Sequence, residues 1–553
     1  MLAHVNSILI IVSFIVRFLK VGTEMSNKYK QSFLRGTLIL IIAGLITRFL
    51  GFVNRIVVAR IMGEEGVGLY MMAVPTFILA ITLTQLGLPV AISKLVAEAE
   101  TLGDRPKIKK ILVVSLAVTG VTSIIFTTGM IVLAPILSNT LLTDARTYYP
   151  LIAISPVVPI IALSSVLRGY FQGLQNMRPA AYSQVIEQVV RIALVAVITK
   201  ALLPYGVEFA AAGAMISAVL GELASLLFML TMFKMRKQIK IRRNFFKQMK
   251  AGKSTLDDLL RIALPTTGSR LIGSLSYFVE PIVVSQSLAI AGVATALATM
   301  QYGQLTGYAI PLLLLPSFVT TSLSVSLVPA ISEAAAKGQS LVIEHRLQQA
   351  LRLALVTGGL SIVILYIFAT PLMELMFNTT KPAIYVQLMA PFFLLLYFQG
   401  PLQATLQALD LAKAAMINSL IGAVVKIVAI FAFASRPEFG IMGVAIAIVL
   451  GILLVTLLHF ATIIKTISYT FYVKDYVKSM VTMVASGLFG GFIFTHFIVD
   501  ASLLIRTLTA IAFTSILYFI LLLIFRLVLK EEIKRIPYLG PRLAVLIPNS
   551  KKR

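Results

Sequence analysis

Fourteen apolar stretches recur along the chain and are separated by short polar breaks. Each is long enough to cross the hydrocarbon core of a bilayer as a helix, which takes about 20 residues. The predicted helices are 33–53, 67–92, 111–137, 148–168, 181–200, 208–233, 259–284, 297–329, 350–377, 384–409, 414–434, 440–464, 479–499 and 505–528. The pattern predicts an all-α integral membrane protein of about 14 transmembrane helices.

Basic residues gather in alternate breaks between these stretches. With the N-terminus inside, 37 of the 48 Lys and Arg residues fall in cytoplasmic segments and seven fall on the opposite side. An excess of Lys and Arg in cytoplasmic loops sets the orientation of membrane proteins, and a missed helix would reverse the alternation downstream. We therefore predict a multi-pass protein of the cytoplasmic membrane with both termini cytoplasmic.

The second half of the chain resembles the first. A shift of 226 residues places residues 33–35 (FLR) on residues 259–261 (LLR), and a shift of 235 places Arg191 on Lys426. Several such matches, in order and at slowly growing offsets, indicate an internal repeat of six helices. An even number of helices gives both copies the same orientation, and the cargo site of transporters built in this way is expected between the copies.

The repeat and the charge pattern together define the predicted organisation. It consists of a cytoplasmic N-terminal segment 1–32, an N-lobe of helices 1–6 (33–233), a basic cytoplasmic linker 234–258, a C-lobe of helices 7–12 (259–464), helices 13 and 14 (465–528) and a basic cytoplasmic tail 529–553. A second start-like sequence begins at Met25, so we interpret residues 1–24 as a mis-assigned start, with an interfacial helix as the alternative.

Composition narrows the class of protein. The chain is 58% hydrophobic and 13% charged, whereas soluble domains carry about 25% charged residues. The absence of Cys excludes disulfides, a thiolate nucleophile and a Cys-ligated metal. The net charge of +26 is explained by the cytoplasmic loops, so no nucleic-acid partner is expected. We find no phosphate-binding loop motif and no catalytic or metal-ligating constellation, and we predict neither an enzyme nor a cofactor.

Helix 5 carries a polar stripe that cannot face lipid. Its members, which are spaced as one face of a helix, are Gln184, Glu187, Gln188 and Arg191. Two interpretations stay open for the charged pair. Glu187 and Arg191 either bond across one turn and hold the lobe together, or line a cavity and act in gating or coupling.

Further ionisable residues lie at membrane depth, where they are costly unless they face a cavity or each other. They are Arg48, Arg55 and Arg60 in or just after helix 1, Glu222 in helix 6, Arg270 and Glu280 in helix 7 and Lys426 in helix 11. The basic members are candidates for binding an anionic cargo, because guanidinium groups hold phosphates bidentately, and the acidic members are candidates for gating. For Arg55 and Arg60 the alternative is that they extend to the membrane interface.

Helix-breaking prolines recur in helices that are counterparts in the repeat. Pro75 and Pro89 lie in helix 2, and Pro311 and Pro316 lie in helix 8. Proline in a spanning helix leaves a kink whose freed backbone groups need other partners. Matched bending at these hinges could open and close the cavity, and static packing kinks are the alternative.

Several motifs resemble the multidrug/oligosaccharidyl-lipid/polysaccharide exporter superfamily. TRFLGF (47–52) and ARIMG (59–63) are similar to its helix 1 motif. The run 63–98 and the turn RGYFQGLQNMRP (168–179), followed by QVIEQVVR (184–191), look like its polysaccharide-exporter branch, and within it most like the sporulation members. The resemblance covers roughly residues 30–530.

The resemblance implies a flippase for a polyprenyl-pyrophosphate-linked saccharide. In the related lipid II flippase family, arginines of helices 1 and 8 line the cavity, and helices 13 and 14 form a groove for the lipid tail. Arg48 and Arg60 match that pattern, whereas the family's Arg-Asp pair reads Asn54-Arg55 here. The helix 8 arginine falls near Gln304, which is a departure that weakens the transfer of the family's cargo.

We predict an alternating-access flippase, and the resemblance implies lipid II as its leading cargo, in peptidoglycan synthesis for the spore cortex. The expected partners are a lipid-linked oligosaccharide and membrane lipids, with cell-wall synthesis proteins as further candidates, and the driving force is a membrane potential or an ion gradient. The alternatives are a multidrug or cation antiporter of the same superfamily and a non-transporting scaffold of a cell-wall synthesis complex.

Overall fold

The computed structural model describes residues 33–527 apart from 236–248, 250, 251, 468, 471 and 498. Every regular element in these residues is a helix, which confirms the predicted all-α class. The predictions for residues 1–32, for most of the linker and for the tail 529–553 lie outside the described residues.

Twelve segments of the described chain are long and apolar enough to cross a membrane. One of them, Ile42–Thr101, has 60 residues and would be about 90 Å long as a straight helix, much more than one crossing requires. The helix Arg178–Leu202, which carries the predicted polar stripe, is not among the twelve. The predicted count of fourteen is therefore not confirmed.

The described residues form two compact units. The first comprises residues 33–307 and 431–441, and the second comprises residues 308–430 and 442–527. The predicted repeat places residues 259–307 with the C-lobe, but within the first unit α10 (Lys253–Ile290) and α11 (Thr295–Gly303) pack on helices of the N-terminal half. The two units are defined by packing, whereas the predicted lobes are defined by sequence similarity. The lobe boundaries therefore stay a prediction.

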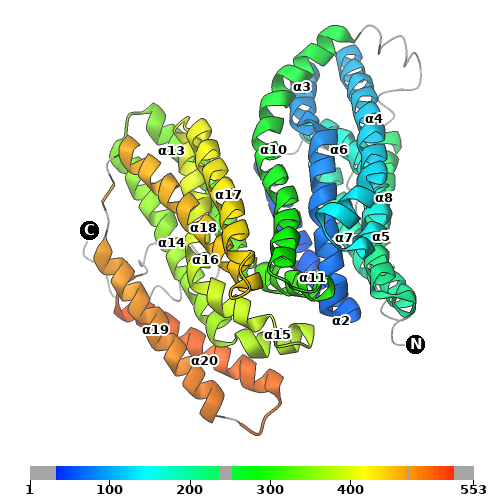
Figure 1. Ribbon diagram of the computed structural model, residues 1–553. Helices are drawn as coiled ribbons and strands as arrows, with labels where there is room; N and C mark the ends of the chain where they lie inside the picture. Colours follow the sequence, from blue (N-terminus) through cyan, green and yellow to red (C-terminus); the bar gives the residue numbers. More distant parts are fainter. Residues whose placement is uncertain are drawn as a thin grey trace. The chain divides into compact units, whose positions relative to one another are not determined.

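The first unit is built around a long N-terminal helix (Figure 1). Its other elements are α3 (Leu88–Thr101), α4 (Arg105–Ile136), η2 (Leu137–Leu141), η3 (Ala145–Thr147), α5 (Tyr148–Ile154), α6 (Val157–Gly173), α7 (Arg178–Leu202), η4 (Leu203–Tyr205), α8 (Val207–Met235), α10 and α11. The long helix, α2 (Phe33–Gln85), packs against α4, α6, α7, α8, α10 and α11, so more helices of the unit meet at α2 than at its other helices.

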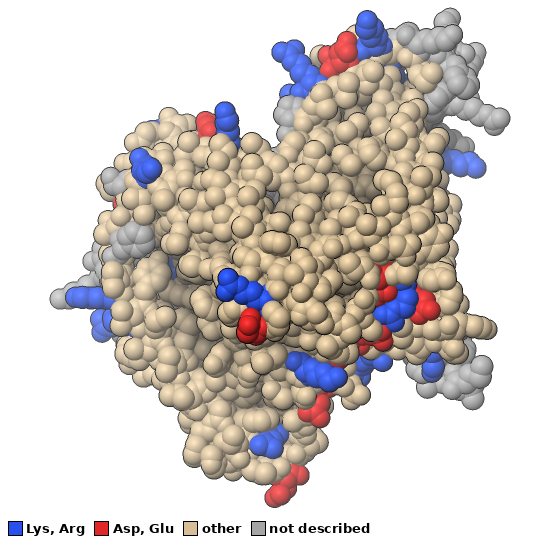
Figure 2. All heavy atoms as spheres, viewed as in Figure 1, with Lys and Arg blue, Asp and Glu red and all other residues tan. Residues whose placement is uncertain are grey.

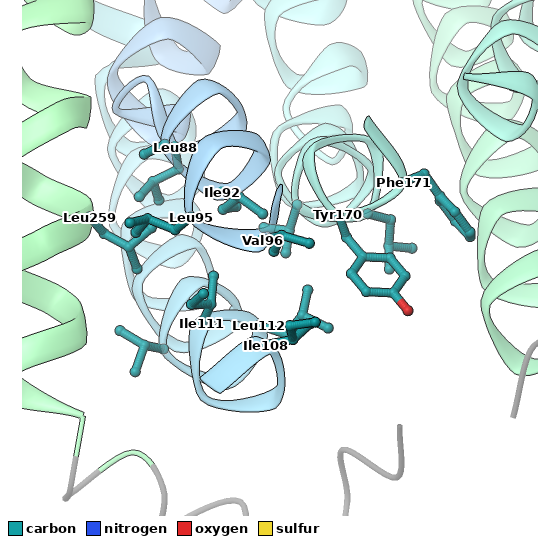
Figure 3. Packing of buried hydrophobic residues seen from close by; sticks show 14 of the residues in the cluster. Leu88, Ile92, Leu95, Val96, Ile108, Ile111, Leu112, Tyr170, Phe171 and Leu259 are labelled. Atoms are coloured by element: carbon teal, nitrogen blue, oxygen red, sulfur yellow. The ribbon is translucent and has the colours of Figure 1, made fainter. Parts of the chain in front are cut away.

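One core cluster of this unit lies where α3, α4 and α6 meet (Figure 3). Leu88 and Ile92 of α3 are fully buried, as are Ile111 of α4 and Phe171 of α6. Leu259 of α10 joins the same cluster. Burying one such side chain contributes about 1.5–3 kcal/mol in water. The cluster therefore holds α3, α4 and α6 together near the turn that joins α3 to α4.

The second unit holds the remaining helices. They are α12 (Ile310–Leu314), α13 (Ser317–Ala336), α14 (Ser340–Ile367), α15 (Ala369–Phe377), α16 (Ala383–Ala408), α17 (Ala412–Ala434), α18 (Gly440–Thr466), α19 (Val473–His496) and α20 (Leu503–Ile524). The π-helix η5 (Gln304–Ala309) contains the boundary between the units. The α19–α20 pair packs on α14, where the Tyr518 hydroxyl donates to the Val356 carbonyl oxygen at 2.8 Å.

The predicted break between helices 1 and 2 is present as a kink within α2. It lies at Gly63, whose φ is 68° and which falls inside the expected break at residues 54–66. A second break, which was not predicted, lies at Leu86 and Gly87, both with positive φ, near the end of the predicted second helix. Pro75 lies inside α2, but Pro89 lies in the first turn of α3, where the missing N–H has no helical acceptor to lose.

Helix 8 of the prediction is not one helix. It consists of α11, η5, α12 and α13, with Pro311 in the first turn of α12 and Pro316 at the start of α13. A π-helical turn followed by two prolines interrupts the regular hydrogen-bond ladder. The predicted breaks are therefore present, and their use as hinges stays a prediction.

Glycines let α2 and α11 approach each other closely. A Cβ atom at Gly68 would lie 2.0 Å from the Thr299 carbonyl oxygen, and one at Gly303 would lie 2.4 Å from the Glu64 carbonyl oxygen. Any larger residue at either position would have to push the two backbones apart. The contact fixes residues 64–68 of α2 against α11.

The surface in view carries few charges. Figure 2 shows a face that is largely uncharged, with acidic and basic side chains gathered in small groups. A lipid-facing surface has this character, because charged side chains are costly in the hydrocarbon region.

Candidate functional site

A chain of alternating charges crosses α6, α7 and α8 in the first unit. Arg191 and Glu187, one turn apart on α7, form an ion pair. The second oxygen of Glu187 lies 3.9 Å from Arg168 Nη2 of α6. The same nitrogen contacts Glu222 Oε1 of α8 at 2.9 Å and the Ser225 hydroxyl at 3.3 Å. The order is therefore Arg191, Glu187, Arg168, Glu222, with a formal charge of zero.

Burial differs along this ion chain. The side chain of Glu222 is 3% exposed and that of Glu187 is 13% exposed. The side chains of Arg168 and Arg191 are 22% and 23% exposed. Gly221 brings α8 onto α7, since a Cβ atom there would lie 2.9 Å from the Glu187 carbonyl oxygen. The glycine thus lets Glu222 reach the charges of the neighbouring helices.

The predicted pairing of Glu187 with Arg191 is observed, and it is part of a larger network. Arg168, which was not among the predicted site residues, bonds to the predicted site residue Glu222. Spacing along one helix can suggest a pair four residues apart, but Arg168 and Glu222 are 54 residues apart. No pattern within a single helix could have found this pair.

The arginines of α2 stand on the surface of the first unit. Arg48, Arg55 and Arg60 are each exposed. The ring of Tyr277 on α10 lies close enough to Arg55, Glu280 and Tyr70 to interact electrostatically with each of them. Glu280 is 6% exposed. The structure therefore brings Arg55 of helix 1 and Glu280 of helix 7, two independently predicted site residues, to the same tyrosine.

The remaining basic candidates lie apart from this tyrosine. Arg270 is exposed on α10, ten residues before Glu280. Lys426 is half-buried on α17 in the second unit. A Cβ atom at Gly451 of α18 would lie 3.1 Å from Lys426 Cβ, and one at Gly221 would lie 3.1 Å from Arg191 Cβ. The predicted equivalence of Lys426 and Arg191 thus extends to the glycine on the next helix.

A second charged cluster, which sequence reasoning missed, lies where α4 turns back to α5. Asp144 bonds to Arg146 at 2.9 Å and accepts from the Thr299 hydroxyl of α11 at 2.7 Å. Arg146 also bonds to Glu65 of α2 at 2.6 Å. Burial alone would raise the pKa of Asp144, but the hydrogen bonds from Arg146 and Thr299 outweigh it and hold that pKa below its usual value.

The same region ties α2 to the helix 8 position singled out by the sequence. Gln304 Nε2 donates to Glu64 Oε2 at 2.6 Å, next to the kink at Gly63. Gln304 is 4% exposed, so its amide is held within the first unit. Among the residues that the structure describes, no group of three or more His, Asp and Glu side chains could hold a metal ion.

Comparison with known proteins gives these residues a family context. The model of the "Polysaccharide biosynthesis protein" family matches residues 33–335, more than half of the chain. The chain belongs to this family. A second model, MatE, matches residues 283–431. The predicted membership of the multidrug/oligosaccharidyl-lipid/polysaccharide exporter superfamily is thereby confirmed.

Individual proteins of known name are similar to this chain over most of its length. Stage V sporulation protein B of Bacillus subtilis (strain 168) is 60% identical over 92% of this chain and 99% of its own. Lipid II flippase MurJ of the same organism is 25% identical over 83% of this chain and 87% of its own.

Two solved structures share the fold. Lipid II flippase MurJ in an inward closed conformation has a TM-score of 0.65 at 16% identity, over 88% of this chain and 98% of that one. An inward-facing multidrug resistance MATE transporter has a TM-score of 0.60 at 18% identity, over 75% of this chain and 93% of that one. The family member described here is a multi-pass membrane protein of a transport superfamily and not an enzyme.

Proposed function

We propose that this protein is a flippase that moves a polyprenyl-pyrophosphate-linked saccharide across the cytoplasmic membrane. Membership of the polysaccharide biosynthesis family supports a saccharide cargo, and similarity to lipid II flippase MurJ makes lipid II the leading candidate. The 60% identity to stage V sporulation protein B favours a role in sporulation, with spore-cortex peptidoglycan as the product served.

The observation that carries this proposal is the row of exposed arginines on α2. Arg48 and Arg55 are seven residues apart, hence on one face of the helix, and both are exposed within a segment apolar enough to span the membrane. An exposed guanidinium at membrane depth is costly unless it faces water or an anion. We assign this face of α2 to the pyrophosphate of the cargo.

The other candidates take supporting roles in this proposal. Arg60, Arg270 and Lys426 add positive charge for the saccharide-pyrophosphate head, and Glu280 acts as a gate beside Tyr277. The α19–α20 pair accommodates the polyprenyl tail, which stays in lipid. Both termini are cytoplasmic.

Transport proceeds by alternating access in this proposal. The kinks at Gly63 and Pro75 and the interrupted segment from η5 to α13 supply positions where backbone angles can change without loss of regular hydrogen bonds. Membrane potential or an ion gradient drives the cycle.

Binding of fluorescently labelled lipid II to the purified protein tests the head-group assignment. Removing a charge-assisted hydrogen bond costs about 1.5–3 kcal/mol, so Arg55→Ala should weaken binding by roughly tenfold or more, and Arg55→Lys should restore part of it. Arg436→Ala removes an exposed arginine that the proposal leaves out and should bind as the wild type does. Equal affinities of Arg55→Ala and wild type would contradict the assignment.

A multidrug or cation antiporter is the second candidate, because the MatE model matches residues 283–431. Such a protein needs carboxylates free to bind a cation, whereas Glu187 and Glu222 are each ion-paired. A quaternary ammonium dye that binds in place of lipid II, and that is insensitive to Arg55→Ala, would favour this candidate. A scaffold would bind neither ligand.

A further inference from the structure

Glu222 is the acidic end of the ion chain and has fewer ion pairs than Glu187, the other carboxylate. Glu187 forms ion pairs with Arg191 through one oxygen and with Arg168 through the other, whereas the ion pair of Glu222 is with Arg168. It is also the more buried of the two carboxylates, at 3% exposure against 13%. A buried carboxylate that has one cationic partner and a second carboxylate nearby is the group in a network that accepts a proton most readily.

We propose that proton uptake at Glu222 switches the N-terminal ion chain from neutral to cationic and thereby prepares it to hold an anionic cargo. The inference rests on the proposed function, because the anion is the pyrophosphate-linked head group. The proton binds to a carboxylate oxygen of Glu222, and no covalent bond other than this O–H forms or breaks. Glu187, Arg168 and Arg191 keep their charges, so the net charge of the four groups rises from zero to one.

The geometry shows which group is released. Once Glu222 is neutral, the contacts of Arg168 with a charged group reduce to the one with Glu187 at 3.9 Å. The Nε atoms of Arg168 and Arg191 are both buried, and neither has an acceptor among the described residues. The Arg168 guanidinium then has donors available for phosphate oxygens, which it can bind bidentately.

Neighbouring elements add other titratable groups to this region. Those on the helices packed against α6, α7 and α8 are Arg48, Arg55, Arg60, Glu64, Glu65 and Tyr70 of α2, Lys94, Glu98 and Glu100 of α3, Arg105, Lys107, Lys109 and Lys110 of α4, Tyr148 and Tyr149 of α5, and Tyr205 of η4. Arg168 and Glu187 are the charged groups that act most strongly on Glu222. Gly51 of α2 lies beside Gln188, where a Cβ atom would be 3.9 Å from Oε1, so Arg48 and Arg55 flank the same contact.

The second half of the chain lacks this switch. By the repeat, Lys426 takes the place of Arg191, but the position of Glu187 is occupied by Gly422. The residue after Gly451, where Glu222 follows Gly221, is Ile452. The C-terminal counterpart therefore has a basic residue but neither of the two carboxylates of the ion chain.

Coupling between proton and cargo is reciprocal, so pH must change cargo affinity. The test is the Kd of labelled lipid II between pH 8 and pH 6, a range in which its pyrophosphate, substituted at both ends, stays ionised. Wild-type affinity should rise by about tenfold, a typical coupling. Glu222→Gln mimics the protonated state and should bind at pH 8 as wild type does at pH 6, with no pH dependence. Glu222→Asp should restore the dependence.

The matched control is Glu344→Gln. Glu344 is a buried carboxylate of α14 that accepts a hydrogen bond from the Thr470 backbone N–H at 2.7 Å, and its variant should keep the wild-type pH dependence. A wild-type pH dependence in Glu222→Gln would overturn the proton switch while leaving the flippase intact. Absence of lipid II binding to the wild type at every pH would overturn the proposed function and this inference with it.

Discussion

Asp144 shows how a single buried carboxylate can hold three segments together. It accepts hydrogen bonds from Arg146 and from Thr299 of α11, and Arg146 continues to Glu65 of α2. The side chain of Asp144 is 3% exposed. Because its pKa is held below the usual value, the carboxylate stabilises the fold above its unfolded pKa of about 4, and this stabilisation is lost as pH falls through the folded pKa.

Asp144→Asn should therefore destabilise the protein at neutral pH and much less in acid. The loss of charge-assisted hydrogen bonds predicts a decrease of about 2 kcal/mol in the free energy of unfolding at pH 7. Thermal unfolding in detergent, followed at pH 7 and below pH 4, checks this. Equal differences between variant and wild type at both pH values would contradict the role given to the carboxylate.

At the scale of the helix, the hydrophobic pattern predicts that a helix is present better than it predicts where that helix is interrupted. The predicted helix 414–434 is observed as Ala412–Ala434, and 384–409 is observed as Ala383–Ala408. The break at Leu86 and Gly87 was missed because Gly87 and Pro89 were interpreted as a bend inside one spanning helix, whereas positive φ at two successive residues ends the helix. The ion pair of Arg168 with Glu222 was missed because it depends on how separate helices pack.

The close approach of α2 and α11 gives a test at the same scale. Gly68→Ala would place a Cβ atom 2.0 Å from the Thr299 carbonyl oxygen, and overpacking of this kind costs about 1–3 kcal/mol. Gly129→Ala in α4 is the control, because nothing lies within 4 Å of its Cβ position, and alanine there should be neutral or slightly stabilising. We expect a lower melting temperature for Gly68→Ala alone, and similar melting temperatures for both variants would show that the helices adjust.

At the scale of the whole molecule, the predicted repeat distinguishes charges with a counterpart in the other half from charges without one. Arg191 and Lys426 each pack against a glycine of the following helix, which agrees with the predicted equivalence of the two positions. The carboxylates Glu187 and Glu222 belong to the first copy alone. Sequence reasoning found the shared basic position, but the role of the carboxylates emerged from three helices that meet in space.

The central claim is transport of a lipid-linked saccharide through a site that includes the arginines of α2. Translocation of lipid II by the purified protein in proteoliposomes tests it most directly, with wild type, Arg48→Ala, Arg55→Ala and the control Arg436→Ala reconstituted at equal density. We predict translocation by the wild type and the control, and its loss in Arg48→Ala and Arg55→Ala. No translocation by the wild type, under a membrane potential or an ion gradient of either sign, would contradict the account.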